Sequence, residues 1–360
     1  MYILCVGILL IFAGLCFCKI RSLDILISIL IYIYLVALTY FSTNIADNLE
    51  YTSLFDYVNI NPEVVSSVTS SNWVRICQLG IQNKLSYQQL KTILFAICLL
   101  IIFLLIKKWV GNNISFVLSL YLTFPALIDI IQIRFFVALV CCIIGLYFLE
   151  QDKKWTFLLY VICVFLGATI HNTVIFFLIF ILIPIVKKYR SKLLISIVSI
   201  DLFFLIFGKS FLSIIENIVS DKQAKYFDYG LPLLSCVAMI IIMILLALIC
   251  HMISQQIVHN DKIKDKYKNI AEFIDNANTC MLLLIGILPL SFNMYRLERI
   301  SWILFYILLG IMLKYNIDIN IFNKVKVNAK LMATITYIIV FTIMVLHFEP
   351  AAFWSYPFFN

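Results

Sequence analysis

Apolar runs follow one another along the chain from Tyr2 almost to His347, and only short polar stretches separate them. With 64% hydrophobic and 13% charged residues, the chain carries more apolar surface than a soluble fold of 360 residues buries. The bilayer must therefore be its solvent, and backbone groups inside a bilayer are satisfied by helices. We expect an all-α, polytopic integral membrane protein in which residues 1–360 form a single transmembrane domain.

Basic residues gather in six short clusters between the apolar runs, as they do in cytoplasmic loops. These clusters hold 18 of the 27 lysines and arginines and lie at Lys19/Arg21, Lys107/Lys108, Lys153/Lys154, Lys187 to Lys192, Lys262 to Lys268 and Lys314 to Lys330. The formal charge of +8 thus reflects topology and indicates no nucleic-acid partner. Alternation between the clusters predicts about twelve transmembrane helices in a GT-C-like arrangement, with both termini outside. The expected spans are 2–18, 23–41, 92–106, 114–131, 134–149, 155–170, 172–186, 193–208, 231–253, 277–293, 300–314 and 331–347.

Two outer loops of this topology are long, at about 42–91 and 209–230. Connections of this length usually contain surface or re-entrant segments. The first loop is rich in acidic and aromatic residues, and it is either a lid or wall over a substrate or a solvated connector. Four of the six arginines also fall on the outer side, where the topology does not require them: Arg75, Arg134, Arg296 and Arg299.

Residues 155–186 are bounded by basic clusters at both ends, so they must cross the membrane an even number of times. A tight helical hairpin meets this requirement, with His171 and Asn172 at its tip. At the rise of an α-helix, each arm of about 15 residues reaches roughly 22 to 24 Å, short of the roughly 30 Å hydrocarbon core. The tip is therefore expected below the outer surface.

The same measure places Arg134, Arg296 and Arg299 at about the depth of His171, roughly 22 to 27 Å above the inner ends of their helices. A charged side chain that faces lipid at this depth is costly, so these groups are expected to face a cavity filled with water or substrate. The alternative is that the arginines snorkel to outer headgroups and that Asp129 or Glu298 supplies a structural ion pair.

The residue types at this depth favour transfer chemistry on a lipid diphosphate. A neutral imidazole accepts a proton from a hydroxyl, and arginines bind a diphosphate through paired hydrogen bonds. Motifs for phosphate loops, serine hydrolases and zinc proteases are absent from the sequence. The eleven cysteines lack the spacing of metal ligands, so neither a metal site nor a cofactor is expected. Asp201, inside an apolar run without an obvious partner, is not assigned to the site.

A particular order of polar residues runs through the chain. It consists of the segment Asn44–Tyr51 with Asp47, the stretch from Ile133 and Arg134 through Tyr147 to Lys154, the segment Ala168–Asn172 with His171, and the turn Tyr295–Arg299. This order resembles that of the EpsG family of Wzy-like polysaccharide polymerases.

The resemblance implies a glycosyltransferase that joins oligosaccharide repeat units carried on undecaprenyl diphosphate, at the outer leaflet of a bacterial cytoplasmic membrane. Capsule, exopolysaccharide and O-antigen synthesis use such enzymes, together with membrane lipid, a chain-length regulator and a flippase as partners. His171 is then the candidate catalytic base, with Asp47 as its competitor, and Arg134, Arg296 and Arg299 are candidate diphosphate ligands. A lipid-linked saccharide flippase and an O-antigen ligase are the alternatives.

The topology can be tested by thiol labelling. A cysteine in place of Asp221 should react with a reagent that cannot cross the membrane, whereas one in place of Lys264 should react only after lysis, because the two positions are predicted on opposite sides. The parent chain without its native cysteines is the control. Labelling of both positions in intact cells, or of neither, would contradict the topology.

Overall fold

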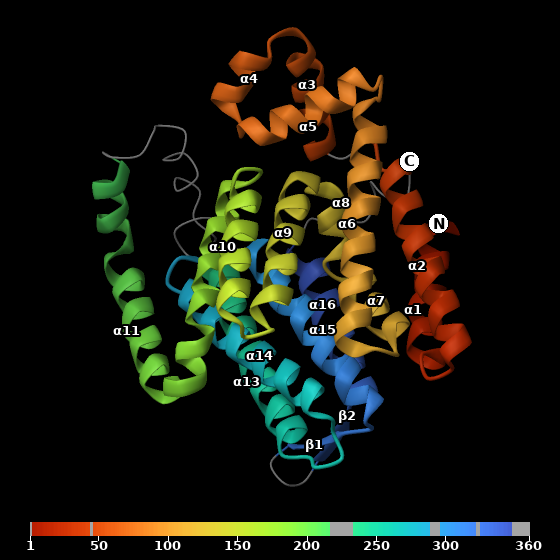
Figure 1. The fold of residues 1–360 in the computed structure, drawn as a ribbon, viewed down its shortest axis with the longest axis vertical. Coiled ribbons are helices and arrows are strands. Elements are labelled where there is room, and N and C mark those ends of the chain that lie inside the picture. Colours follow the sequence, from red (N-terminus) through yellow and green to blue (C-terminus); the bar gives the residue numbers. More distant parts are fainter. Residues whose placement is uncertain (1, 44–45, 217–232, 289–295, 322–324, 348–360) are drawn as a thin grey trace. The chain divides into compact units, whose positions relative to one another are not determined.

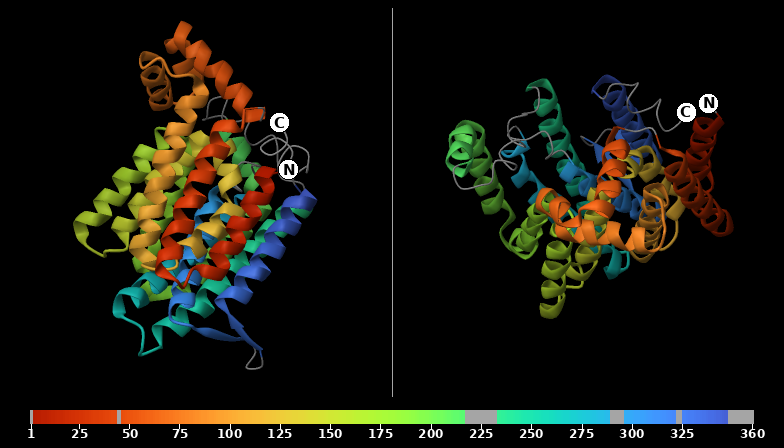
Figure 2. Two further views of the ribbon diagram at one scale, coloured as in Figure 1. Left: turned by 90° about the vertical axis from the view of Figure 1, so that its right-hand side faces the viewer. Right: turned by 90° about the horizontal axis from the view of Figure 1, so that it is seen from above.

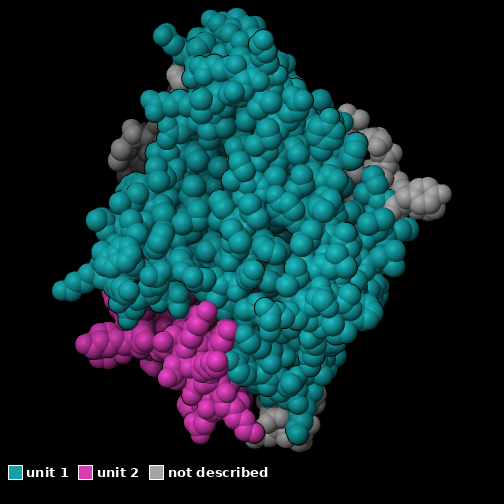
Figure 3. Space-filling view, turned by 45° about the vertical axis from the view of Figure 1, so that its right-hand side comes forward, with its two compact units in different colours: residues 1–175, 309–360 teal, residues 176–308 magenta. Residues whose placement is uncertain are grey.

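The computed structural model describes residues 2–43, 46–216, 233–288, 296–321 and 325–347. They form two compact units, which Figure 3 colours separately: residues 1–175 with 309–360, and residues 176–308. Both units are built almost wholly from helices, as expected (Figure 1). The single transmembrane domain over residues 1–360 stays a prediction.

Helix α7 (Ile114–Thr123) is the centre of the first unit, and every residue from Ile114 to Leu122 is buried. Its neighbours are α1 (Tyr2–Phe17), α2 (Arg21–Phe41), α6 (Tyr87–Val110) and α16 (Ala329–His347). Helix α1 comes close because it carries Gly14, where a Cβ atom would lie 2.7 Å from the carbonyl oxygen of Ser115. Small residues of this kind are typical where membrane helices touch.

Helices α9 (Ile133–Leu149) and α10 (Lys154–Ala168) pack along their length in the same unit. Gly167 brings them together, since a Cβ at this position would lie 2.8 Å from the carbonyl oxygen of Ala138. The short helix α8 (Ala126–Ile131) leads into α9, and Gln132 is the C-cap residue of α8 and the N-cap residue of α9. The two helices therefore meet at a single residue.

Residues 46–82, which belong to the first long loop, fold into α3 (Ala46–Ile60), α4 (Pro62–Val68) and α5 (Ser71–Gln82). We call these three helices the cap. The rings of Tyr51 and Phe55 in the cap contact the ring of Tyr87 at the start of α6. The ring of Trp73 in turn contacts that of Tyr51. Figures 1 and 2 show the cap at this end of α6 from two directions. The loop is thus a packed helical segment, as its length suggested.

The hairpin tip predicted at His171 and Asn172 is present, but its second arm begins as a 3₁₀-helix, η1 (Asn172–Leu182). Buried side chains recur every three residues, at Val174, Phe177, Phe180 and Ile183. This spacing matches the three residues per turn of a 3₁₀-helix, which rises about 2.0 Å per residue. Residues 172–186 therefore span about 28 Å, and the shorter length expected from an α-helical rise is wrong for this arm.

The second unit contains α11 (Ile183–Glu216), α13 (Leu233–Val258), α14 (Asp265–Met281), the 3₁₀ turn η2 (Leu282–Leu284) and most of α15 (Arg299–Lys314). Tyr189 interrupts α11 with non-helical backbone angles, between two of the predicted spans. Helix α14 begins twelve residues before the predicted span 277–293, and its buried face carries Asp275, Asn276 and Asn278. The apolar run thus marked only the end of this helix.

Among the described residues, four helices are long and apolar enough to cross a membrane: Arg21–Phe41, Tyr87–Val110, Asn172–Phe207 and Cys236–Val258. Five further apolar helices are shorter: Ile3–Phe17, Ile114–Thr123, Ile133–Leu149, Lys154–Ala168 and Ala329–Ile339. The chain is a membrane-embedded helical protein, whereas the count of twelve and the GT-C-like arrangement stay predictions.

Two elements depart from the expected helices and loops. An antiparallel hairpin of β1 (Asp318–Ile321) and β2 (Val325–Asn328), with Asp318 opposite Asn328, precedes α16 and was not predicted. Helix α11 also continues to Glu216, into the predicted outer loop at about 209–230. Residues 217–230 of that loop lie outside the described part of the chain.

Candidate functional site

Arg134 stands in the first turn of α9, and its Nε donates a 2.8 Å hydrogen bond to the carbonyl oxygen of Ile170. Ile170 precedes His171 in the turn between α10 and η1, so the structure joins two of the predicted site segments. A cation at a helix N-terminus opposes the helix macrodipole, by about 0.3–1 kcal/mol. Helix stability therefore does not explain why an arginine opens α9.

His171 lies at intermediate burial in the turn that closes α10. Its backbone N–H donates to the carbonyl of Gly167 at 2.9 Å, and its Nδ1 lies 2.8 Å from Thr173 Oγ1. The imidazole also meets the ring of Phe135 edge-on, with centroids 5.3 Å apart. Since Phe135 directly follows Arg134, the same turn of α9 contacts both the imidazole and the backbone beside it.

The cap reaches the same turn through the start of its third helix, α5. Ser70, at the N-terminus of α5, donates to the carbonyl of Ile170 at 2.7 Å, and Asn72 Nδ2 donates to Thr169 Oγ1 at 2.7 Å. Arg75 Nη1 approaches Asn72 Oδ1 at 3.4 Å. The sequence singled out Arg75 but not Ser70 or Asn72, because nothing in a polar loop marks which hydroxyl or amide meets a turn 100 residues away.

Asp47 lies in the first turn of α3, and its side chain is outside the described part of the chain. Its neighbour Asn48 accepts a 3.0 Å hydrogen bond from Lys91 Nζ, which also donates to the carbonyl of Ser42 at 3.2 Å. Lys91 is 1% exposed, so a fully buried cation lies beside the segment that carries Asp47. A lysine at the start of an apolar run was the available signal, and it was missed.

Arg296 and Arg299 belong to the second unit, and Arg299 is 1% exposed at the N-terminus of α15. Within the described residues, Arg296 Nε and Glu298 Oε1 are buried without a hydrogen-bond partner. Arg299 thus repeats the feature of Arg134, an arginine that opens a helix. The convergence of these two arginines with Arg134 and His171 stays a prediction.

Other buried acids have structural partners. Asp24 accepts the N–H groups of residues 113–115 at 2.8–3.2 Å and the Ser115 hydroxyl at 2.7 Å, and so caps α7. Asp129 accepts the Tyr121 hydroxyl at 2.8 Å. Asp201, which lacked an obvious partner in the sequence, accepts the N–H of Gly286 at 2.9 Å.

Asp275 holds three helices of the second unit together. Arg190 of α11 pairs with it in bidentate fashion at 2.5 and 2.8 Å, and His251 Nδ1 of α13 lies 2.8 Å from its Oδ2. The Asp275 side chain is 3% exposed. Such charge-assisted pairs fix geometry as well as adding free energy. Arg190 was read from the sequence only as part of a topological cluster.

No group of three His, Cys, Asp or Glu side chains in the described residues is arranged to hold a metal ion. The cysteines are all free thiols.

The helices and polar contacts together define a membrane-embedded protein with arginines and a histidine at helix ends. The family model of EpsG matches residues 24–358, almost the whole chain. The chain therefore belongs to the EpsG family. No curated protein and no solved structure matches it.

Replacing Asp275 with Asn should lower the stability of the second unit, because Arg190 and His251 lose the carboxylate that they share. We expect a loss of about 2 kcal/mol in the free energy of unfolding, since Arg190 is partly exposed. Glu272→Gln is the matched control, because the Glu272–Lys187 pair is exposed and should contribute less than about 0.5 kcal/mol. Thermal unfolding of the purified chain in detergent measures both. An equal effect of the two variants would contradict the assignment.

Proposed function

We propose that this protein is a polysaccharide repeat-unit polymerase, a glycosyltransferase that extends an oligosaccharide carried on undecaprenyl diphosphate at the outer leaflet of a bacterial cytoplasmic membrane. Membership of the EpsG family supports polysaccharide synthesis. The observation that carries the proposal is the hydrogen bond from Arg134 to Ile170, because it joins an arginine at a helix N-terminus to the turn of a histidine.

An anionic leaving group suits the start of α9. The N-terminus of a helix presents N–H groups and a partial positive charge to an anion, and a guanidinium adds a full charge with fixed donors. In the proposed reaction, an acceptor hydroxyl attacks the anomeric carbon and the bond from that carbon to the diphosphate oxygen breaks. The electron pair leaves with the diphosphate, whose growing charge Arg134 stabilises. Arg296 and Arg299 are further diphosphate ligands in this scheme.

His171 takes the proton of the attacking hydroxyl. To accept that proton at Nε2, the neutral imidazole must carry its own proton at Nδ1. Its Nδ1–H then donates a hydrogen bond to Thr173 Oγ1, 2.8 Å away. Thr173 is therefore a positioning residue, which fixes the tautomer of His171 through a hydrogen bond. Asp47 is the competing base.

The cap forms a wall of the proposed site. Its bonds from Ser70 and Asn72 to the turn beside His171 favour this role over that of a solvated connector. A wall that excludes water strengthens the attraction between the arginine and the diphosphate and limits hydrolysis of the donor.

The site is tested by complementing a strain that lacks the gene and separating its polysaccharide by length on a gel. His171→Ala should lower polymerisation by about 10²–10⁴-fold, as the loss of a general base does. Arg134→Ala should lower it by about 10²–10³-fold, as the loss of one electrostatic donor does. Both strains should accumulate single repeat units at the outer surface. His259→Ala, at an exposed position, is the control.

Polymer of wild-type length from either site variant, at equal protein level, would overturn the corresponding assignment. Repeat units that stay at the cytoplasmic face would instead point to a flippase. Full-length polymer that is not attached to its final acceptor would point to a ligase.

Thr173→Val should lower the polymerisation rate in vitro about tenfold, because one hydrogen bond of roughly 1.4 kcal/mol no longer selects the tautomer. Thr173→Ser keeps the hydroxyl and should retain most of the rate. Thr334→Val, an exposed position on α16, is the control. The pH profile of the rate supplies a second readout, since it should change only in Thr173→Val. If the serine variant is as slow as the valine variant, Thr173 does not act through its hydroxyl.

A further inference from the structure

Five carboxyl side chains are buried among the described residues, and four of them accept hydrogen bonds. The four are Asp24, Asp129, Asp201 and Asp275. Glu298, the fifth, is 4% exposed, and its Oε1 is buried without a hydrogen-bond partner. A buried acceptor that lacks a donor costs free energy, and a charged one costs more. The chain thus tolerates at Glu298 a cost that it avoids at its other buried acids.

Ser301 carries a second unpaired atom close to Glu298. It is 3% exposed, and its Oγ also has no hydrogen-bond partner within the described residues. Glu298 ends a 3₁₀ turn that leads directly into α15, and Ser301 is the third residue of that helix. Side chains three residues apart lie on the same face of a helix, with about 5–6 Å between their Cβ atoms. One small ligand can therefore contact both atoms.

Neither helix capping nor ion pairing accounts for the buried oxygen of Glu298. A carboxylate ahead of a helix can accept the free N–H groups of the first turn, but Glu298 Oε1 accepts none. The sequence also allowed Glu298 as half of a structural ion pair. In the part of the chain that the structure describes, the acids found in ion pairs are Glu272 and Asp275. A ligand or a trapped water molecule is what remains to donate to this oxygen.

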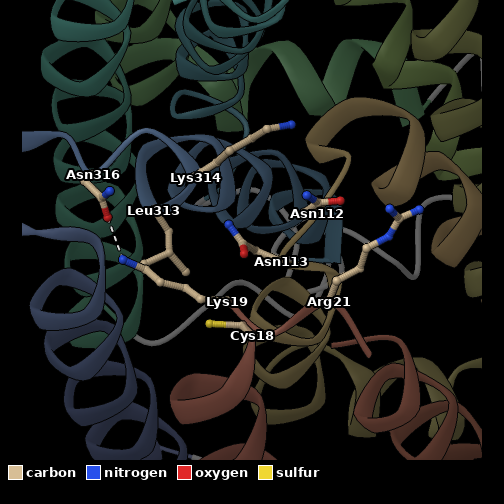
Figure 4. Close-up of a pocket in the computed structure, with 8 residues that line it drawn as sticks. All are labelled: Cys18, Lys19, Arg21, Asn112, Asn113, Leu313, Lys314 and Asn316. Carbon is tan, nitrogen blue, oxygen red and sulfur yellow. Dashed lines mark hydrogen bonds between the residues drawn. The ribbon is translucent and has the colours of Figure 1, made fainter. Parts of the chain in front are cut away.

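The other end of α15 shows polar groups that the chain pairs by itself. Lys314, the last residue of the helix, donates from Nζ to the carbonyl of Val110 at 2.9 Å. It lines a cavity of about 230 Å³, in which Lys19 Nζ donates to Asn316 Oδ1 at 2.5 Å (Figure 4). Partners within the chain account for these contacts, so the cavity carries no comparable signal for a ligand.

We propose that Glu298 and Ser301 bind hydroxyl groups of the sugar that is attached to the lipid diphosphate. The inference rests on the proposed function, in which Arg299, between these two residues in the sequence, binds the diphosphate. The anomeric carbon of this sugar is bonded to a diphosphate oxygen, so the groups that bind its hydroxyls must lie beside those that bind the diphosphate. A carboxyl oxygen accepts from a hydroxyl, and a serine hydroxyl both donates and accepts. Buried groups of this kind also reject ligands that leave them unpaired, so the two residues contribute specificity for the sugar.

Binding to the full chain in detergent separates recognition of the sugar from recognition of the diphosphate. The probes are undecaprenyl diphosphate and the lipid-linked saccharide extracted from the strain that lacks the gene, and the wild-type protein should bind the saccharide lipid more tightly. Glu298→Met, which keeps the chain length without an oxygen, and Ser301→Ala should each weaken binding of the saccharide lipid about tenfold, as the loss of one hydrogen bond does. Their affinity for undecaprenyl diphosphate should not change. Glu298→Gln keeps an acceptor oxygen and should retain most of the affinity.

The unfolding temperature without ligand gives an independent readout. Glu298→Met and Ser301→Ala should unfold at the wild-type temperature or above it, because the removed atoms make no hydrogen bond in the folded chain. Glu272→Met and Ser196→Ala, outside the proposed site, are the matched controls and should bind both lipids like the wild type.

Equal affinity of the wild-type protein for the two lipids would overturn the proposal. Wild-type affinity in both Glu298→Met and Ser301→Ala would also overturn it and would assign the unpaired atoms to trapped water. Lower unfolding temperatures with equal losses of affinity for both lipids would mark a structural role and overturn it as well. Each of these results leaves the polymerase standing if the wild-type gene restores polymer. Weaker saccharide binding in the variants, with no polymer from the wild-type gene, would support the sugar contacts and overturn the polymerase.

Discussion

The carbonyl oxygen of Ile170 accepts hydrogen bonds from Arg134 and from Ser70, which reach it from α9 and from the cap. Ile170 lies in the turn that follows α10, and leaving its carbonyl unpaired away from water would cost about 1–3 kcal/mol. The two side chains remove that cost. In doing so they fix the turn that carries His171, so the position of the candidate base depends on the pairing of this carbonyl.

The need to pair buried polar groups also explains which buried acids have a structural role. Asp24 saturates the N-terminus of α7, and Asp201 accepts the N–H of Gly286. Asp275 ties α11, α13 and α14 together through its contacts with Arg190 and His251. Each of these carboxylates accepts hydrogen bonds from buried N–H groups of the backbone or of a side chain. Arg134 differs from them, since a cation at a helix N-terminus adds to the local positive potential, which suits the anionic leaving group of the proposed reaction.

Sequence reasoning located the turn at His171 and the helix start at Arg134 because both depend on local signals, the length of an apolar run and the position of a charge. It did not identify Ser70, whose partner lies 100 residues away, since such a contact depends on tertiary packing. Lys91 was missed although its place at the start of an apolar run is a local signal. The hairpin at Asp318–Asn328 was missed because its strands lie within a basic cluster that was read only as a cytoplasmic loop.

The sequence could not distinguish the 3₁₀ arm from an α-helix, because every residue from Val174 to Ile183 is apolar and no period stands out. Only burial in the folded chain separates residues 174, 177, 180 and 183 from their neighbours, at the spacing of a 3₁₀ turn. Long 3₁₀-helices have poorer hydrogen bonds than α-helices, so η1 depends on burying this stripe. Thr173 lies one residue before the stripe and stays half-buried. Thr173 Oγ1 lies 2.8 Å from His171 Nδ1, so the first turn of η1 contacts the imidazole through this one side chain.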